Sequence, residues 1–422
     1  MGYYLVSLRY FLYLFIRNSW FGRLMQTLKK LILGSLLSFS LSATASTDYG
    51  ISEGNEELLI QGLESLASQQ FDTALTQFRE LTEKRPDFRL AQLVYADLLA
   101  AQANPLGGIG SLGGQRQKEI QGLIEEAKVR LRVNKDKPGP DLIPESLIQM
   151  SDDQKYVIVI DTNYSRLFLM ENRNGEPHLV KDYYASYGRG GTEKEKRGDL
   201  KTPLGVYFVT GRFKDEALPE RYGSGALPLN YPNVWDYRNG RTGSGIWLHG
   251  SPVDTYSRPP KASEGCISLT NPDFQDLDKL VDIQNTPVLI GHNMKWVGRD
   301  EWLSRQKSLR QTVENWRKDW ESRDHQRYIS HYSKQFNDSD KNYESFSAYK
   351  ERVNSSKSYI KVDISDLSLF TYPNDPNLMV VTFNQRYESD NYKGDSIKRQ
   401  YWLNEKGKWK IAYEGAPSKG VP

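Results

Sequence analysis

The sequence predicts a multidomain protein with an α-helical N-terminal segment, a β-rich central domain and an α+β C-terminal domain. The chain has 422 residues, which exceeds one typical domain of roughly 100 to 200 residues. Apolar residues recur at helical spacing towards both ends of the chain, whereas short strand-like runs and glycines fill the middle. The composition, 38% hydrophobic and 26% charged, is that of an ordinary globular protein.

Residues 1–45 predict a secretory signal peptide. From Met25 the sequence has two lysines, an apolar run over 31–41 and an Ala-Thr-Ala site at 43–45, the order typical of a cleaved signal. Met25 is an alternative start, because the aromatic stretch before it fits no second signal. Cleavage and retention as a membrane anchor both stay open. Either outcome places the rest of the chain in the cell envelope, and we expect the periplasm.

The charge balance argues against nucleic acid as a partner. The chain carries 56 basic and 53 acidic residues, and without residues 1–45 the balance becomes 51 to 53. Nucleic-acid binding needs a basic surplus or patch. Cys266 is the one cysteine of the chain, so it cannot form an internal disulfide and is an unpaired thiol that needs an explanation.

Residues 50–135 predict helices. Ala74, Phe78, Leu81 and Pro86 have spacings that resemble a tetratricopeptide hairpin. A small helical bundle that packs or dimerises is the simpler interpretation. The following stretch, 136–151, contains three prolines and no apolar period, which predicts a linker.

Residues 152–292 predict a β-rich domain. The runs KYVIVID, SRLFLMEN and TPLGVYFVTGRF have the composition of strands and are bounded by turn residues. Glycines are frequent there, and long helical periods are absent from the sequence.

Residues 297–416 predict helices followed by an antiparallel sheet, an α+β arrangement. This order resembles the nuclear transport factor 2 (NTF2)-like fold. The aromatic stripe of the predicted helices is interpreted as core, not as a ligand site. It consists of Trp302, Leu309, Val313, Trp316 and Trp320 on one face, continued at four-residue steps by Tyr328, Tyr332 and Phe336.

Cys266 and His249 predict nucleophilic chemistry. A thiol attacks a carbonyl carbon as the thiolate, so it needs a base, and histidine has a suitable pKa. Gly265 before the nucleophile permits a tight turn. The glycines at 188, 190 and 191 lack the Gly-Lys-Ser/Thr of a phosphate loop, and the five histidines have no metal-ligand spacing. We therefore expect no cofactor and no metal.

These residues lie in a pattern that resembles the L,D-transpeptidase (YkuD-type) catalytic domain. That family has a His-Gly element followed by [ST]-H-G-C, and here IWLHG and SEGCIS occupy those places. TPLGVY at 202–207 resembles the upstream strand entry of the family, and SYGRGG at 186–191 its glycine loop.

The resemblance implies roles for individual residues. Cys266 would be the nucleophile and His249 the proton acceptor and donor. The carbonyl of Gly250 would orient the imidazole, and the N–H groups of Gly265 and Cys266 would form an oxyanion hole. The substrate would be a peptidoglycan stem tetrapeptide, attacked at its third residue with loss of the terminal D-alanine.

The chain departs from the family at two positions. Glu264 stands where the family most often has histidine, and Ser268 stands where it has arginine or asparagine. Arg258 is a candidate to replace the lost contact to a substrate carboxylate. Ser263 and Trp247 are further candidates for substrate binding, with a core role for Trp247 equally open.

The order of segments resembles the cell-shape L,D-carboxypeptidases, in which the helical segment serves dimerisation. An L,D-transpeptidase acting in cell-wall remodelling and cell shape is the first prediction. An L,D-carboxypeptidase that trims tetrapeptide to tripeptide at the same site, and a non-catalytic envelope scaffold, are the alternatives. A homodimer through the N-terminal helices is expected.

Overall fold

The computed structural model describes residues 51–103, 114–214 and 218–417, so the predicted signal peptide lies outside the described residues. The chain divides into two units. The first contains the N-terminal helices up to Asn134 together with Asp254–Ser257, and the second contains the rest. Within the described ranges, none of the helices is long and apolar enough to cross a membrane.

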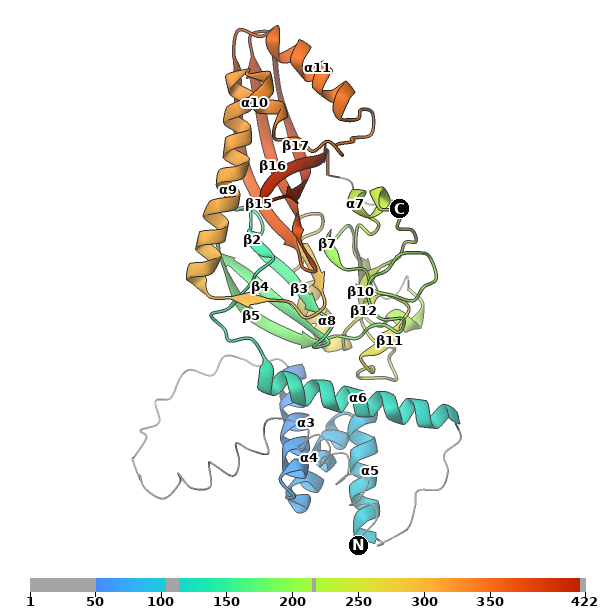
Figure 1. Cartoon of the computed structure of the whole chain (residues 1–422). Helices are drawn as coiled ribbons and strands as arrows, with labels where there is room; N and C mark the ends of the chain where they lie inside the picture. The colour runs from blue at the N-terminus through green and yellow to red at the C-terminus, as the bar shows by residue number, and fades with distance from the viewer. Residues whose placement is uncertain (1–50, 104–113, 215–217, 418–422) are drawn as a thin grey trace, which may run out of the picture. The chain divides into compact units, whose positions relative to one another are not determined.

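The first unit is helical, as the sequence predicts (Figure 1). Ala74, Phe78 and Leu81 on one face of the second helix are fully buried. They pack with residues of the neighbouring helices and with Tyr256 in one hydrophobic core. The helices are α3 (Ile51–Ala67), α4 (Phe71–Lys84), α5 (Arg89–Ala103) and α6 (Gly114–Asp136).

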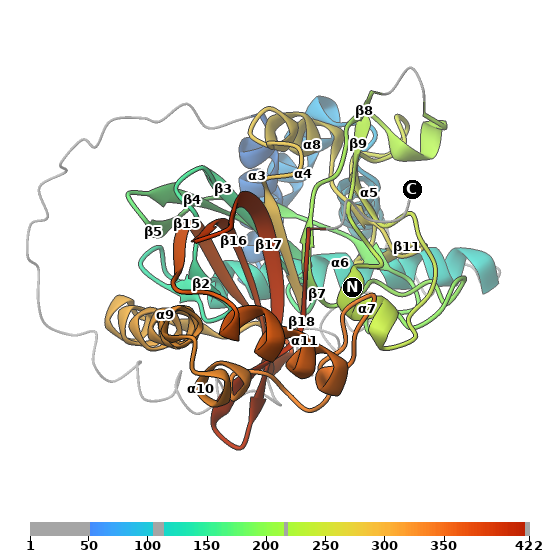
Figure 2. The same ribbon diagram turned by 90° about the horizontal axis from the view of Figure 1, so that it is seen from above.

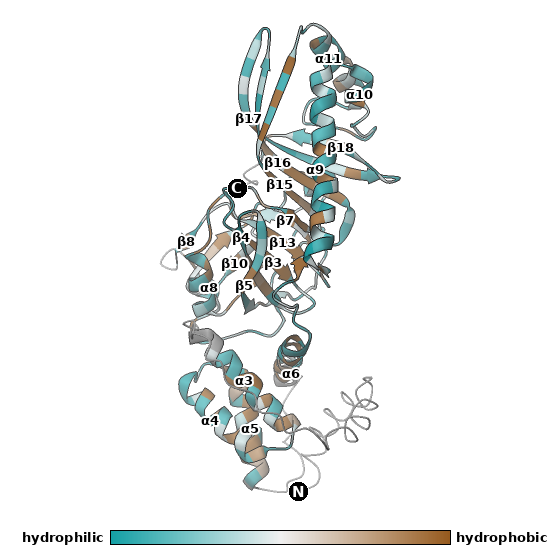
Figure 3. Cartoon of the chain, turned by 90° about the vertical axis from the view of Figure 1, so that its left-hand side faces the viewer, coloured by the Kyte–Doolittle hydropathy of each residue, from teal (hydrophilic) through white to brown (hydrophobic). Residues whose placement is uncertain are grey.

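The central domain is built on a five-stranded sheet of order β5-β4-β3-β13-β7. Its middle strand has the sequence YVIVID, in which β-branched residues suit a strand buried on both faces. Figure 3 shows β3 and its neighbour β13 in the brown of hydrophobic residues. The strands are β3 (Tyr156–Asp161), β4 (Arg166–Arg173), β5 (Glu176–Tyr184), β7 (Gly205–Phe208) and β13 (Pro287–Gly291).

A second sheet of the same domain, of order β12-β10-β9-β8, and the two-stranded pair β11-β6 carry the residues of the predicted site. A short helix, α8, follows the site and is capped by the Thr270 side chain. The remaining elements are β6 (Tyr187–Gly188), β8 (Phe213–Lys214), η2 (Glu220–Tyr222), β9 (Gly225–Pro228), α7 (Val234–Arg238), β10 (Trp247–His249), β11 (Lys261–Ser263), β12 (Ile267–Ser268), α8 (Asn271–Asp278) and β14 (Trp296–Val297).

The C-terminal domain packs three helices on one face of a long antiparallel sheet (Figure 2). All five apolar residues predicted on one face of the first helix are buried, so this stripe is core, as expected. The elements are α9 (Arg299–Ser322), α10 (His325–Ile329), α11 (Tyr343–Ser355), β15 (Ile360–Tyr372), β16 (Asp375–Ser389), β17 (Tyr392–Glu405) and β18 (Lys408–Gly415).

The predicted linker 136–151 contains structure. Two short strands form there, β1 (Ile143–Pro144) and β2 (Leu147–Gln149). The second pairs with β15, with Leu147 opposite Phe370, and completes the C-terminal sheet. Burial of Leu147 and Ile148, both fully buried, stabilises this strand. A strand of three residues is too short to be predicted from an alternating pattern.

The helical period after Trp320 is also interrupted. Arg323 adopts the left-handed conformation and ends α9, and the Asp324 side chain caps α10. Tyr332 therefore lies beyond α10, although its ring is buried in the same core.

The central and C-terminal domains share a hydrophobic core. Val157, Phe168 and Val206 of the central domain cluster with Phe370 and Tyr401 of the C-terminal sheet. The shared core argues that the two domains form one stable body.

Trp316 is expected to be a main source of stability in the C-terminal domain. Its side chain is fully buried among Trp320 and Phe383. We expect Trp316→Ala to lower the free energy of unfolding by about 3–5 kcal/mol, because it leaves a large cavity. Denaturant unfolding checks this, with the exposed Tyr392 changed to alanine as control. Equal losses in the two variants would contradict the assignment.

Candidate active site

Strand pairing brings the predicted nucleophile and base together. β10 and β12 are parallel neighbours, with Leu248 opposite Ile267 and His249 opposite Ser268. Cys266 directly precedes β12 and therefore lies at the end of this pair, next to Trp247. The thiol is half-buried and donates a hydrogen bond to the carbonyl of Gly245 at 3.3 Å.

The turn before Cys266 requires glycine. Gly265 has φ +127°, and a Cβ atom there would lie 2.8 Å from the carbonyl oxygen of Lys201. The glycine carbonyl also accepts a hydrogen bond from Thr202 Oγ1 at 2.9 Å. The predicted TPLGVY element thus holds the nucleophile turn from the opposite side.

The Ser263 side chain is hydrogen-bonded within the turn that precedes Cys266. Its buried hydroxyl donates to the carbonyl of Cys266 at 2.5 Å and accepts from the N–H of Gly265 at 3.1 Å. The sequence predicts a substrate contact for Ser263 and an oxyanion-hole donor at Gly265. In the structure the Gly265 N–H and the Ser263 hydroxyl are hydrogen-bonded to each other, and both roles stay predictions.

The Cys266 thiol is protonated at rest. Burial raises its pKa to about 11, although the backbone N–H of Trp247 and the positive charges of Arg258 and Arg221 lower it. The nearby Glu264 carboxylate contributes a smaller rise. A thiol with this pKa needs a base that removes its proton during attack.

His249 is the candidate for this base. The side chain is buried, and burial lowers its pKa to about 4, so the imidazole is neutral at neutral pH. Its Nδ1 atom lies 2.6 Å from the carbonyl oxygen of Gly250. That oxygen also accepts from Ser268 Oγ at 3.2 Å. Nδ1 therefore carries the hydrogen, which leaves Nε2 as the proton acceptor. Ser268 thus binds the same carbonyl oxygen that orients the imidazole.

An aromatic wall lies beside the imidazole. The ring of Tyr222 meets the His249 imidazole edge-on, with ring centroids 5.1 Å apart. It also packs against Trp247, with centroids 4.8 Å apart. The rings of Phe213 and Trp247 are also in contact, with centroids 5.3 Å apart. The sequence predicts Trp247 near the reacting centre. It does not predict Tyr222 or Phe213 there, because neither lies in a recognisable motif. Their positions follow from the fold, because β8 lies beyond β9 in the same sheet as β10, and the rings of Phe213 and of Tyr222 in η2 both contact Trp247.

Two arginines give the site a positive potential. Arg258 and Arg221 both lower the pKa of Cys266 and of His249. Arg258 is predicted from the sequence, whereas Arg221 is not. At the exposed rim, Glu264 pairs with Arg189 at 3.0 Å, so the carboxylate that replaces the family histidine has its own cationic partner.

The arrangement suits acyl transfer from a peptide with a nearby carboxylate. A neutral imidazole can take the thiol proton as sulfur attacks, and the same nitrogen can return it to a leaving amine. The two arginines can bind an anionic group of the substrate. The site contains each group that a cysteine acyl-enzyme mechanism needs except an assigned pair of oxyanion donors.

Two family models match separate parts of the chain. The L,D-transpeptidase catalytic domain matches residues 155–290. The Cds6 C-terminal NTF2-like domain matches residues 308–415. The fold class predicted from the sequence is confirmed by these matches together with the structure.

Similar proteins share one domain or the layout of both. A putative L,D-transpeptidase of Escherichia coli, YafK, is 25% identical over 144 residues, which are 32% of this chain and 54% of that protein. The chain thus spans about half the length of the curated relatives it matches. Bd1075 of Bdellovibrio bacteriovorus is 32% identical with a TM-score of 0.60, over 66% of this chain and 99% of that one. The helical cell shape determining protein Pgp2 of Campylobacter jejuni is 25% identical with a TM-score of 0.55, over 70% of this chain and 100% of that one.

Proposed function

Because the chain belongs to the L,D-transpeptidase (YkuD-type) family and carries a C-terminal NTF2-like domain, we propose that it is a peptidoglycan enzyme that acts on stem tetrapeptides. The observation that carries the proposal is the neutral pair of Cys266 and His249 at the end of two paired strands. The proposed reaction is acyl transfer through a thioester on Cys266.

The first half of the reaction forms the thioester. His249 takes the thiol proton as the Cys266 sulfur bonds to the carbonyl carbon of the third stem residue. The amide bond to the terminal D-alanine breaks, and the same proton goes to the departing amine. Arg258 and Arg221 bind a substrate carboxylate. They replace the contact expected from the arginine or asparagine that the family has where this chain has Ser268.

The second half depends on the acceptor. With an amine of another stem peptide, the product is a 3,3 cross-link and the protein is an L,D-transpeptidase, the first of our predictions. With water, the product is a tripeptide and the protein is an L,D-carboxypeptidase. The similarity to Pgp2 in domain layout, which extends over 100% of that chain, favours a role in cell shape. The L,D-carboxypeptidase is the second candidate.

Mass spectrometry of a purified disaccharide-tetrapeptide incubated with residues 46–422 tests the proposal. Cross-linked dimer that lacks one D-alanine would identify a transpeptidase, and tripeptide alone would identify a carboxypeptidase. If neither product appears and no thioester can be trapped on Cys266, the enzyme proposal fails and the envelope scaffold replaces it.

We further propose that the protein acts in the cell envelope, with the periplasm as its compartment. This rests on the predicted signal peptide and on the peptidoglycan substrate. Signal cleavage after residue 45 and a homodimer through the N-terminal helices stay predictions.

A further inference from the structure

A buried ion pair lies in the charged run TEKEKRGD, residues 192–199 of the central domain. Most of this run is exposed, but the side chains of Lys194 and Asp199 are only 4% and 8% exposed. Lys194 Nζ lies 2.6 Å from Asp199 Oδ1. Burial of two charges is costly even when they are paired. The proposed chemistry does not use this pair, so its burial needs another explanation.

The Asp199 carboxylate binds the backbone of its own loop. Its Oδ2 atom accepts hydrogen bonds from the N–H groups of Glu195 at 2.9 Å and Lys196 at 3.0 Å. Its Oδ1 atom accepts from the N–H of Lys201 at 3.1 Å. Burial raises the pKa of Asp199, but the hydrogen bonds from Lys194 and from the backbone lower it more, so the pKa lies well below its usual range. The ionised carboxylate therefore forms strong, charge-assisted hydrogen bonds to the loop.

The backbone after Asp199 has a conformation that needs such support. Leu200 has φ +60°, a left-handed conformation that leucine rarely adopts and that persists only where surrounding contacts enforce it. Its carbonyl accepts from the N–H of Gly190 at 2.9 Å. A Cβ atom on Gly190 would clash with the carbonyl oxygen of Asp199. The predicted glycine loop therefore packs directly against this part of the backbone.

The next two residues hold the nucleophile turn. The carbonyl oxygen of Lys201 lies against Gly265, where it would be 2.8 Å from an added Cβ atom. The Thr202 side chain is fully buried and donates to the Gly265 carbonyl at 2.9 Å. Gly265 directly precedes Cys266. The carboxylate of Asp199 thus binds the N–H of a residue whose carbonyl contacts the turn, and all of these residues lie in one unit of the chain.

We propose that Asp199, with Lys194 as its counter-ion, is a positioning residue that fixes the backbone of the nucleophile turn and so sets the place of the Cys266 thiol. Asp199 acts through the backbone of Lys201 and the side chain of Thr202, and not by binding substrate. Its effect on turnover rests on the proposed function, whereas the environment of the thiol can be measured without substrate.

Alkylation of Cys266 by iodoacetamide is the first measurement, because the chain has a single cysteine. Burial raises the pKa of this thiol to about 11, so little thiolate is present at neutral pH and labelling is slow. A turn that is no longer fixed lets water reach the thiol, and its pKa then falls towards the usual value of about 8.5. A fall of one pKa unit gives about tenfold more thiolate.

We expect Asp199→Asn to speed alkylation by about threefold to tenfold. Asparagine keeps the size of the side chain, but it has no charge and only one acceptor oxygen. With the tetrapeptide, kcat should fall by about tenfold or more with little change in KM, because a small displacement of a reacting group slows the chemical step. An ion pair with a role in stability alone would change the melting temperature and leave both rates of the folded protein unaltered.

Two further variants separate positioning from a failure to fold. Lys194→Met/Asp199→Asn removes both charges, so no unpaired charge is left buried, and it should show the same faster labelling and slower turnover. Thr202→Val removes the hydroxyl that binds the Gly265 carbonyl and should also speed labelling. Its combination with Asp199→Asn should label no faster than the faster single variant, because both changes release the same turn.

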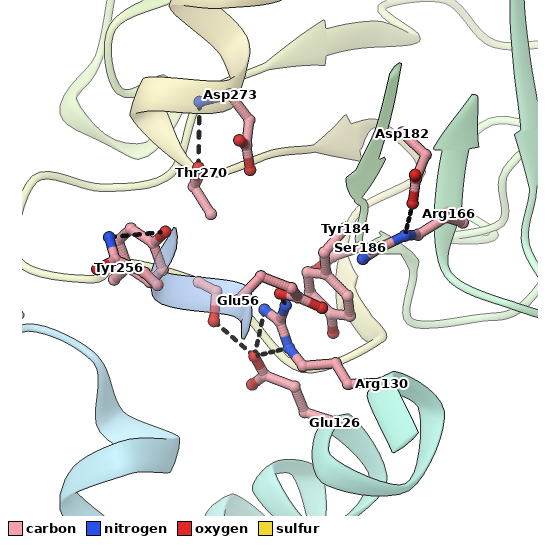
Figure 4. A network of polar contacts seen from close by, with 12 residues as sticks. Glu56, Glu126, Arg130, Arg166, Asp182, Tyr184, Ser186, Tyr256, Thr270 and Asp273 are labelled. Atoms are coloured by element: carbon pink, nitrogen blue, oxygen red, sulfur yellow. Dashed lines mark hydrogen bonds and ion pairs between the residues drawn. The ribbon is translucent and has the colours of Figure 1, made fainter. Parts of the chain in front are cut away.

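Asp182→Asn is the matched control. Asp182 pairs with Arg166 at 2.6 Å in the same domain, as Figure 4 shows, and its side chain is 9% exposed. It lies on β5, at the edge of the five-stranded sheet. The control should lose stability as Asp199→Asn does, but its labelling rate and kcat should stay at the wild-type values.

Unchanged or slower labelling of Asp199→Asn and of the charge-free double variant, with both folded by circular dichroism, would overturn the inference. Equal acceleration in Asp182→Asn would also overturn it, because any lost ion pair would then loosen the site. Accelerations that multiply when Thr202→Val is added would show that Asp199 acts by another route. Absence of turnover by the wild-type protein would count against the proposed function, and the labelling rates would still decide this inference.

Discussion

Cys266→Ala is expected to abolish release of D-alanine from a stem tetrapeptide and to lower kcat/KM by about 10⁴-fold or more. The reason is that the proposed reaction passes through a thioester, which alanine cannot form. The chain has no second cysteine that could substitute. Product formation followed by liquid chromatography and mass spectrometry measures the loss.

Cys266→Ser is the matched variant for this prediction. It keeps a hydroxyl in the place of the thiol, but its oxygen is a much weaker nucleophile without strong activation, so activity should also be lost while the fold is retained. Unchanged melting temperatures in both variants would show that the loss is chemical. Activity of Cys266→Ala within tenfold of wild type would refute the acyl-enzyme mechanism.

His249→Gln is expected to lower kcat by about 10²- to 10⁴-fold, the usual contribution of a general acid–base. Glutamine keeps a polar side chain of similar reach but cannot accept the thiol proton. Because this proton moves only in the reaction, KM should change little. Steady-state kinetics with the tetrapeptide separates the two constants. A rise in KM with unchanged kcat would instead assign His249 to substrate binding.

The pH profile tests the same residue in the wild-type protein. Burial lowers the pKa of His249 to about 4 and raises that of Cys266 to about 11. The active form, with neutral imidazole and neutral thiol, therefore predominates between these values. We expect kcat/KM to be level from about pH 6 to about pH 9 and to fall as the pH approaches 4, because the protonated imidazole cannot accept a proton. A steep rise between pH 6 and 8 would contradict the neutral pair.

Much of the fold follows from local patterns. The apolar run of β3 and the helical stripe of α9 are long enough to be predicted, and each is buried as expected. The helix α11 is not predicted, since only Phe346 and Asn354 of its residues are buried, which leaves a weak apolar period. The strand β2 is missed because its partner, β15, lies more than 200 residues further along the chain.

The sequence by itself determined which residues could carry the chemistry. Cys266 and His249 stand out because a lone thiol, a glycine that permits the turn and a histidine at fixed spacing are properties of the chain and need no neighbours in space. The family resemblance rests on the same letters. The spacing could not determine the protonation states, which depend on burial and on charges from other segments.

Only the tertiary structure decided what surrounds the pair. It places Tyr222 against His249, turns the Gly265 N–H towards Ser263 and includes Ser257 in the helical unit. Each of these contacts joins segments or atoms whose meeting depends on the path of the backbone. Hydrogen bonds, ring contacts and pKa shifts act over a few ångströms, so they are fixed only when the folded chain sets those distances.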